Sequence, residues 1–177
     1  IPEDLQDIIK ATRSGTDDYT TIVGVSAYSG VTNWLLEHKK TGEPGVYDLF
    51  VRNENYNAAL DTLLDKLLAI NETFADIKLD LGIAEKFITT RIQQCKNYLN
   101  SLAEVLASGY VDKHNILLAA REILASIGEA HSAFNSVNIL QNNGISSTFV
   151  DLCGFHDAEF ITIDERIMKA FADVDPS

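Results

Sequence analysis

The chain has 177 residues, 46% of them hydrophobic, and its 14 Lys and Arg stand against 26 Asp and Glu, a net charge of −12. This length and hydrophobic content are typical of one globular domain over residues 1–177, while the acidic balance argues against a nucleic-acid or anionic-membrane surface. Since no run approaches the ~20 apolar residues of a membrane span and the N-terminal stretch is acidic where a signal peptide would be basic, we expect a cytoplasmic protein.

In the N-terminal quarter, the pattern predicts a helix over 2–13, a strand over 20–25, a helix over 32–40 and a loop over 41–47. The turn between the strand and the second helix contains Ser26, Ser29 and Gly30. A helix that starts after such a turn points its unpaired N–H groups at it, and these donors favour a carboxylate or phosphate. The alternative is an ordinary strand-to-helix connection, because Ser and Gly are common turn residues.

Three long helices are predicted next, over 55–75, 81–107 and 112–141, the last with Asp112 as its N-cap. We interpret the first two as an antiparallel hairpin that serves packing or contact between subunits, so a homo-oligomer is possible. The apolar face expected to reach the core in the third helix comprises Ile116, Ala120, Ile123, Leu124, Ile127 and Phe134.

Glu129 falls roughly opposite this apolar face, the usual place of a solvated carboxylate. However, its neighbours one turn away are all small: Ala125, Ser126, Ser132 and Ala133. A ring of small residues lets another backbone or a ligand approach closely. Glu129 is therefore a candidate binding residue.

The C-terminal part should contain a strand over 145–151, an irregular segment over 152–160 and a helix over 164–171, capped by Thr162 or Asp164. Strands joined by long helical crossovers pair in parallel, so we expect an α/β fold whose small sheet is covered by helices on both sides.

Cysteine and histidine spacing indicates no metal site. Cys95 and Cys153 form no C-x-x-C pattern, so we expect reduced structural thiols. The four histidines show no metal-ligand spacing and are interpreted as structural or surface groups: His38, His114, His131 and His156.

Two ordered motifs carry a family resemblance. SAYSGVTN, over 26–33, resembles the second conserved loop of aspartokinases in the amino acid kinase family, and the following LLEHKKTGEPGVY resembles the ectoine-pathway branch. SIGEAHSAFNSVNILQNNGISSTFVDL, over 126–152, resembles the Ser-x-Gly-Glu helix and the strand after it in that family. The resemblance covers roughly residues 17–175.

The resemblance implies a helix-rich fragment of a three-layer α/β/α fold with a small parallel sheet and a long helical hairpin. The parent activity it implies is transfer of the ATP γ-phosphoryl group to the side-chain carboxylate of L-aspartate, with ATP and Mg²⁺. The family's opening Lys-Phe-Gly-Gly loop does not occur in the chain, nor do its ATP-binding and ACT regions. We therefore expect a fragment that is inactive alone, with no cofactor bound to it.

The same resemblance assigns the site. It implies that Ser26 lies near the transferred group, that Thr32 offers its hydroxyl and helix-terminal N–H donors to a substrate carboxylate, and that Glu129 accepts from the substrate ammonium. Gly30 and Asn33 would support the loop. Thr32 and Glu129 should open onto one cleft at the end of the first strand.

Two alternatives stay open. One is another amino acid kinase, acting on glutamate or a nucleotide. The other is a non-catalytic, helix-rich domain whose acidic surface and hairpin serve assembly.

Overall fold

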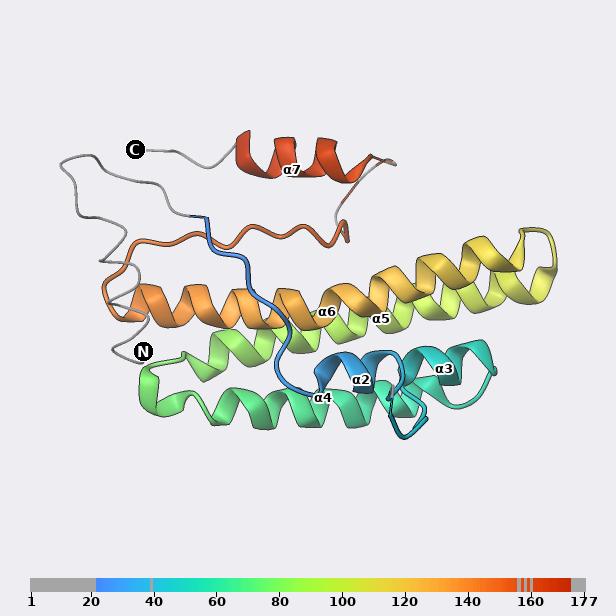
Figure 1. Cartoon of the computed structure of the whole chain (residues 1–177), viewed down its shortest axis with the longest axis horizontal. Helices are drawn as coiled ribbons and strands as arrows, with labels where there is room; N and C mark the ends of the chain where they lie inside the picture. Colours follow the sequence, from blue (N-terminus) through green and yellow to red (C-terminus); the bar gives the residue numbers. More distant parts are fainter. Residues whose placement is uncertain (1–21, 39, 156, 158, 160, 173–177) are drawn as a thin grey trace.

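Three long helices lie side by side along most of the length of the protein (Figure 1). The computed structural model describes residues 22–172 except 39, 156, 158 and 160, so the helix expected over 2–13 lies outside the described residues. The long helices are α4 (Tyr56–Glu72), α5 (Leu81–Ser108) and α6 (Lys113–Asn142). Consecutive long helices run antiparallel, and α5 packs against both of the others. The helical hairpin predicted from the sequence is confirmed.

Each long helix begins directly after a residue whose side chain caps its first turn. The Asn55 side chain accepts from the amide of Ala58 at 3.3 Å, and Asp80 accepts from Ile83 at 3.1 Å. Asp112 does the same for α6, as predicted, with 2.9 Å to the amide of His114. Such side-chain acceptors satisfy amides that have no partner inside the helix.

The core lies between the long helices and is completed by two short ones, α2 (Val31–Leu35) and α3 (Val46–Val51). Val31 and Leu35 of α2 are buried, as is Phe50 of α3. The long helices contribute Leu60, Leu63, Leu67, Ile88, Ile92, Leu99, Ala120, Leu124 and Ile127. Burial of each large apolar side chain contributes about 1.5–3 kcal/mol, so the segment around α2 is held against the bundle by its own apolar residues.

No β-ladder forms among the described residues, so the expected small parallel sheet and its three-layer arrangement are not met there. The part of the first predicted strand that is described, residues 22–25, forms no ladder with another described segment, and Ile22 is 73% exposed. The second, over 145–151, runs back along α6 instead (Figure 1). A strand needs a partner with aligned N–H and C=O groups. Residues 145–151 are instead held by side chains, since Phe149 packs 5.5 Å from the ring of Phe134.

The second predicted helix is shorter than expected, because α2 ends at Leu35 rather than near residue 40. The chain then turns back and pairs Glu37 with Pro44 in an isolated antiparallel bridge. A Cβ on Gly45 would lie 2.4 Å from the carbonyl oxygen of Leu36, so the returning backbone passes directly over the end of α2. The loop predicted to reach residue 47 ends at Gly45, where the unpredicted helix α3 begins.

The segment after α6 is fastened to α5. Arg91 of α5 forms an ion pair with Asp151, and the Tyr98 hydroxyl donates to the carbonyl of Phe155 at 2.9 Å. Burial opposes ionisation of Asp151, but the hydrogen bonds from Arg91 and the Cys153 amide outweigh it and lower the pKa of this carboxyl. Cys95 and Cys153 are both free thiols.

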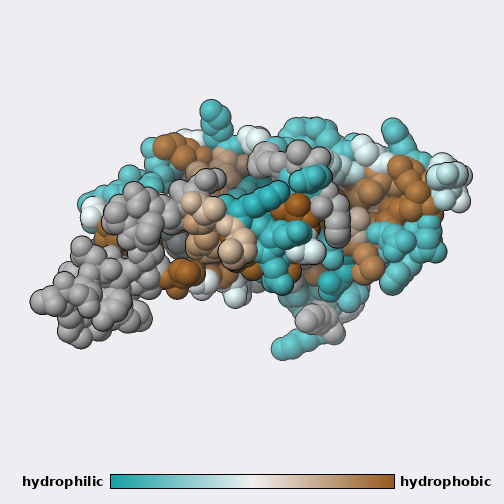
Figure 2. Space-filling model, turned by 90° about the horizontal axis from the view of Figure 1, so that it is seen from above, coloured by the Kyte–Doolittle hydropathy of each residue, from teal (hydrophilic) through white to brown (hydrophobic). Residues whose placement is uncertain are grey.

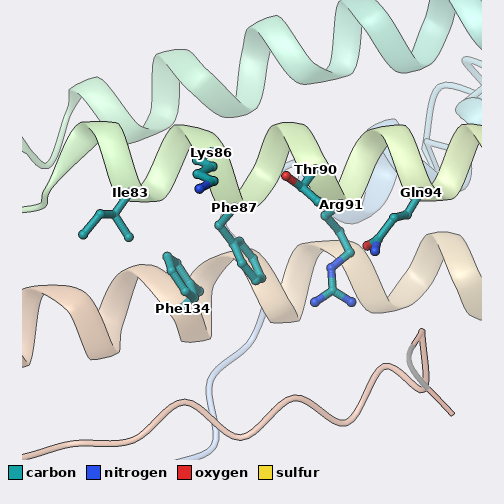
Figure 3. A pocket seen from close by; sticks show the side chains of 7 residues that line it. All are labelled: Ile83, Lys86, Phe87, Thr90, Arg91, Gln94 and Phe134. Atoms are coloured by element: carbon teal, nitrogen blue, oxygen red, sulfur yellow. The ribbon is translucent and has the colours of Figure 1, made fainter.

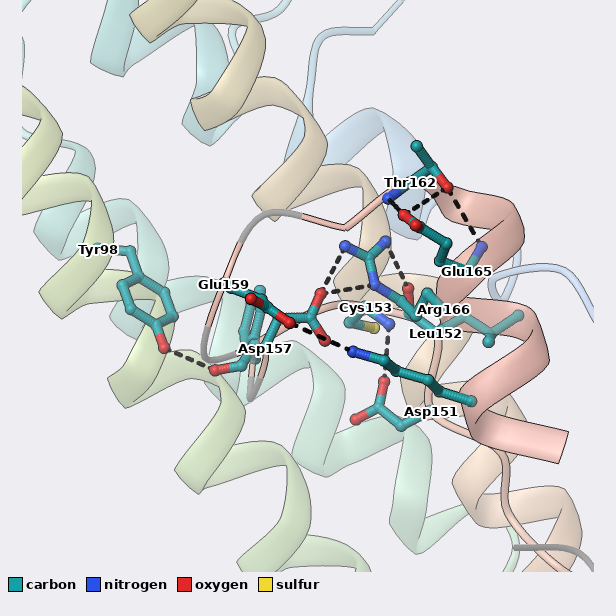
Figure 4. Close-up of polar contacts among 11 residues, drawn as sticks. Tyr98, Asp151, Leu152, Cys153, Asp157, Glu159, Thr162, Glu165 and Arg166 are labelled. Atoms are coloured by element: carbon teal, nitrogen blue, oxygen red, sulfur yellow. Dashed lines mark hydrogen bonds and ion pairs between the residues drawn. The ribbon is translucent and has the colours of Figure 1, made fainter. Parts of the chain in front are cut away.

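The last helix, α7 (Ile163–Ala172), begins with a reciprocal cap (Figure 4). Glu165 accepts from the Thr162 amide at 2.7 Å, and Thr162 accepts from the Glu165 amide at 3.3 Å. Arg166 then donates to Asp157 at 2.8 Å. The predicted helix over 164–171 is confirmed, with Thr162 as its cap.

The surface around α7 mixes hydrophilic and hydrophobic patches in the part of the face that is coloured in Figure 2. Its exposed apolar side chains include Ile163 and Met168, which are 55% and 73% exposed. Within the described residues, no helix combines the length and the apolar character needed to cross a membrane.

Candidate functional site

The turn over 26–30 lies on α6 at the position of Glu129. The hydroxyl of Ser132 lies 2.7 Å from the carbonyl oxygen of Ser26 and 3.1 Å from the carbonyl oxygen of Glu129. One side chain therefore joins the backbone of the predicted turn to the backbone of the predicted carboxylate residue. The structure brings Ser26 and Glu129 together at this hydroxyl.

This close approach requires a glycine on α6. A Cβ on Gly128 would lie 2.7 Å from the Cβ of Ala27 and 3.1 Å from Cγ1 of Val31. A contact of 2.7 Å is essentially never seen for a real Cβ, so any larger residue would push the turn away. The small residues predicted to admit another backbone around Glu129 do so on the side that carries Gly128 and Ser132.

Gly30 shapes the turn before α2. Its φ of 84° lies in the left-handed region, which favours glycine, and it occupies the N-cap position without a side-chain cap. Its carbonyl accepts from the Trp34 amide at 3.1 Å. Thr32 is the second residue of α2 and is therefore not its cap. Asn33 is half-buried, and its carbonyl would lie 2.8 Å from a Cβ on Gly45.

Ser26, Thr32 and Glu129 are all exposed. The structure has two shallow hollows elsewhere. One is lined by Ile83, Lys86, Phe87, Thr90, Arg91, Gln94 and Phe134 (Figure 3). The other is lined by Trp34, Pro44, Gly45, Val46, Ala59, Thr62, Leu63 and Lys66. Neither hollow includes Thr32 or Glu129, so the single cleft expected to hold both is not one of these two.

A buried polar cluster lies beneath the turn, and sequence reasoning did not find it. It consists of Asn71 from the last turn of α4 and of His131 and Asn135 from successive turns of α6, all 0% exposed. His131 Nε2 lies 2.6 Å from Asn71 Oδ1, and Asn135 Nδ2 donates to the same oxygen at 2.7 Å. The signal in the sequence was the i, i+4 spacing of His131 and Asn135 beside the apolar stripe of α6.

Burial sets the protonation of this cluster. It lowers the pKa of His131 to about 4, because a charged imidazolium would lose its hydration without gaining a compensating anion. Burial also raises the pKa of Tyr28, against a smaller opposing effect of the neighbouring Asn135 side chain. His131 is therefore neutral near pH 7.

The turn and the helix it contacts offer little to a nucleotide or a metal ion. Residues 22–37 and 122–142 contain no Lys or Arg, whereas bound phosphates need cations. Among the described residues, no group of three or more His, Cys, Asp and Glu is placed to hold a metal ion. The cations that bound phosphates need are therefore not supplied by residues 22–37 or 122–142.

Comparison with known proteins agrees with the motifs. The chain is 40% identical over 176 residues to the aspartate kinase Ask_Ect of Stutzerimonas stutzeri (strain A1501), a match that covers 98% of this chain. The chain spans only 37% of the length of that relative. No family model matches the chain, and no solved structure gives a significant match. The resemblance to an ectoine-type aspartokinase is thus confirmed along nearly the whole chain.

Proposed function

We propose that this chain supplies the aspartate-binding part of an aspartate kinase, which transfers the γ-phosphoryl group of ATP to the side-chain carboxylate of L-aspartate. The observation that carries the proposal is the Ser132 hydroxyl, which joins the Ser26 turn to Glu129. The similarity to Ask_Ect over 98% of the chain supports it.

The substrate would be held from two sides. Glu129 would accept hydrogen bonds from the ammonium group of aspartate, while the Thr32 hydroxyl and the amides of Thr32 and Asn33 would donate to a carboxylate. Such an arrangement suits a zwitterion, because charge-assisted hydrogen bonds form at both of its ends. Ser26 would lie near the group that accepts the phosphoryl, and Gly30 and Asn33 would hold the turn in shape.

The nucleotide and its Mg²⁺ would be held by residues outside the turn and the facing part of α6, since these two segments have no Lys or Arg. Phosphoryl transfer depends on cations that neutralise the phosphates. When bound, Mg²⁺ would supply this neutralisation. We expect no ADP release from the 177-residue chain by itself, because the family's Lys-Phe-Gly-Gly loop and ATP-binding region do not occur in its sequence.

The test uses the complete protein in which this sequence occurs, called the complete enzyme below. ADP release is measured with ATP, Mg²⁺ and one of three acceptors: L-aspartate, L-glutamate or succinate. Succinate keeps both carboxylates of aspartate but lacks the ammonium. We expect turnover with L-aspartate and little with succinate, because the contact to Glu129 is lost.

Two other outcomes would contradict the proposal. A preference for L-glutamate would indicate a different amino acid kinase. No turnover with any acceptor, together with concentration-dependent oligomerisation, would indicate an assembly domain.

A further inference from the structure

The Asn71–His131–Asn135 cluster connects α4 to α6 directly beneath the predicted site. All three side chains are fully buried, and three of their polar atoms have no hydrogen-bond partner among the described residues: Asn71 Nδ2, His131 Nδ1 and Asn135 Oδ1. Burying polar groups without partners costs free energy, and apolar side chains of similar size would avoid that cost. A role in stability alone therefore accounts poorly for this cluster.

The hydrogen bonds of the cluster fix the His131 ring. Asn71 Oδ1 is an acceptor and lies 2.6 Å from His131 Nε2, so this contact assigns the proton of the neutral ring to Nε2. The Asn135 amide nitrogen donates to the same oxygen and lies 3.2 Å from Nε2, so two donors share one acceptor. The ring is thereby held in one tautomer and one orientation.

Tyr28 connects the buried cluster to the turn. Its ring meets the His131 ring edge-on, with centroids 5.4 Å apart and an angle of 79°, and packs 5.2 Å from Phe74. Tyr28 is the only large residue between Ser26 and Gly30, and its carbonyl accepts from the first amide of α2, that of Val31, at 3.1 Å.

We propose that His131, held by Asn71 and Asn135, is a positioning residue for aspartate binding, because it fixes Tyr28 and through it both Ser26 and the start of α2. This inference rests on the proposed function. His131 does not touch the substrate. It sets where the turn lies relative to Glu129, which is carried two residues earlier on the same helix.

The first experiment compares three variants of the complete enzyme. His131→Leu removes the donor to Asn71, whereas His131→Gln places an amide donor close to the position of Nε2. Leu99→Ala is the control, since Leu99 is also 0% exposed but lies on α5. We expect His131→Leu to raise the aspartate KM ~10-fold with the ATP KM unchanged, and His131→Gln to recover most of this loss. Leu99→Ala should lower the melting temperature and leave both KM values unchanged.

The second experiment does not depend on activity. Amide hydrogen exchange of Val31 is measured by NMR in the 177-residue chain, because this amide bonds to the Tyr28 carbonyl. We expect exchange on the order of tenfold faster in His131→Leu than in Leu99→Ala. If His131→Leu does not fold, Tyr28→Leu replaces it in both experiments, since it removes the ring that meets His131 edge-on, and a change in the same direction is expected.

The outcomes separate the two proposals. If the wild-type enzyme does not use aspartate, the proposed function fails, whatever the exchange rate of the Val31 amide. If aspartate is used but His131→Leu, or Tyr28→Leu in its place, matches Leu99→Ala in aspartate KM and in Val31 exchange, the positioning role alone is wrong.

Discussion

The side chain of Ser132 donates a hydrogen bond to the main-chain carbonyl of Ser26, two residues that are 106 positions apart in the sequence. The contact is possible because Gly128, one turn earlier on α6, leaves room for Ala27. The Ser132 hydroxyl therefore attaches the turn to α6, and the absence of a side chain at Gly128 lets the turn come this close. Both features belong to the face of α6 that also carries Glu129.

Removal of this hydroxyl should weaken aspartate binding. We expect Ser132→Ala in the complete enzyme to raise the aspartate KM and to lower the free energy of unfolding by about 1–2 kcal/mol, because the Ser26 carbonyl loses its partner. Ser136→Ala is the matched control, since the Ser136 hydroxyl bonds only within α6, 2.7 Å from the Ser132 carbonyl. Equal aspartate KM values for the two variants would separate Ser132 from the site.

Glu129 is tested by removing its charge while keeping its shape. If Glu129 pairs with the substrate ammonium, Glu129→Gln should cost on the order of 2–5 kcal/mol of aspartate binding and leave the ATP KM nearly unchanged. Glu122→Gln is the control, because Glu122 is exposed two turns earlier on the same helix. Steady-state kinetics of both variants decide the question, and unchanged aspartate kinetics in Glu129→Gln would make Glu129 a surface carboxylate.

The long helices could be predicted because their information is local. Apolar residues at helical spacing marked α4, α5 and α6, and capping residues such as Asp112 marked where they begin. The helix α3 was missed because Pro44 and Gly45 indicated a loop, while its burial depends on contact with α4 and α6. Strands need partners that a local pattern does not identify, which is why residues 145–151 were predicted as a strand.

In the candidate site, the approach of another segment to α6 could be predicted. Small residues around Glu129 indicated that another segment approaches α6, and the contact of Ser132 with Ser26 agrees with this. The buried cluster was predictable only in part, because the spacing of His131 and Asn135 places them on one face of α6 but does not indicate which residue they meet. Asn71 lies 60 positions away from His131, in another helix.

Thr32 is tested against a purely structural role. If Thr32 donates to a substrate carboxylate, Thr32→Val should remove one charge-assisted hydrogen bond, about 1.5–3 kcal/mol, and raise the aspartate KM roughly 10- to 100-fold. Because Gly30 rather than Thr32 caps α2, stability should change by less than about 0.5 kcal/mol. Thr62→Val serves as the control, since the Thr62 hydroxyl bonds only to Ala58 of its own helix. A lower melting temperature with normal kinetics would exclude the substrate role.

His131 should make the stability of the chain depend on pH. Burial lowers its pKa from 6.5 to about 4, so below pH 6.5 the unfolded chain binds a proton that the folded chain does not. The contribution of neutral His131 is therefore fully present above pH 6.5 and is lost progressively down to pH 4, by an amount on the order of 3 kcal/mol. The lowered pKa of Asp151 acts at more acidic pH, because its unfolded value is already 3.8.

Urea unfolding of the 177-residue chain between pH 4 and pH 7 measures this dependence. His131→Gln keeps a donor to Asn71 but does not titrate, so its free energy of unfolding should vary less over this range by the same ~3 kcal/mol. The exposed His114 provides the control, because His114→Gln should retain the wild-type pH dependence. The remaining histidines and the carboxylates are common to all three proteins, and their contributions cancel in the comparison. Equal pH dependence in His131→Gln and wild type would show that His131 is not held neutral by burial, and that the cluster beneath the turn is open to water.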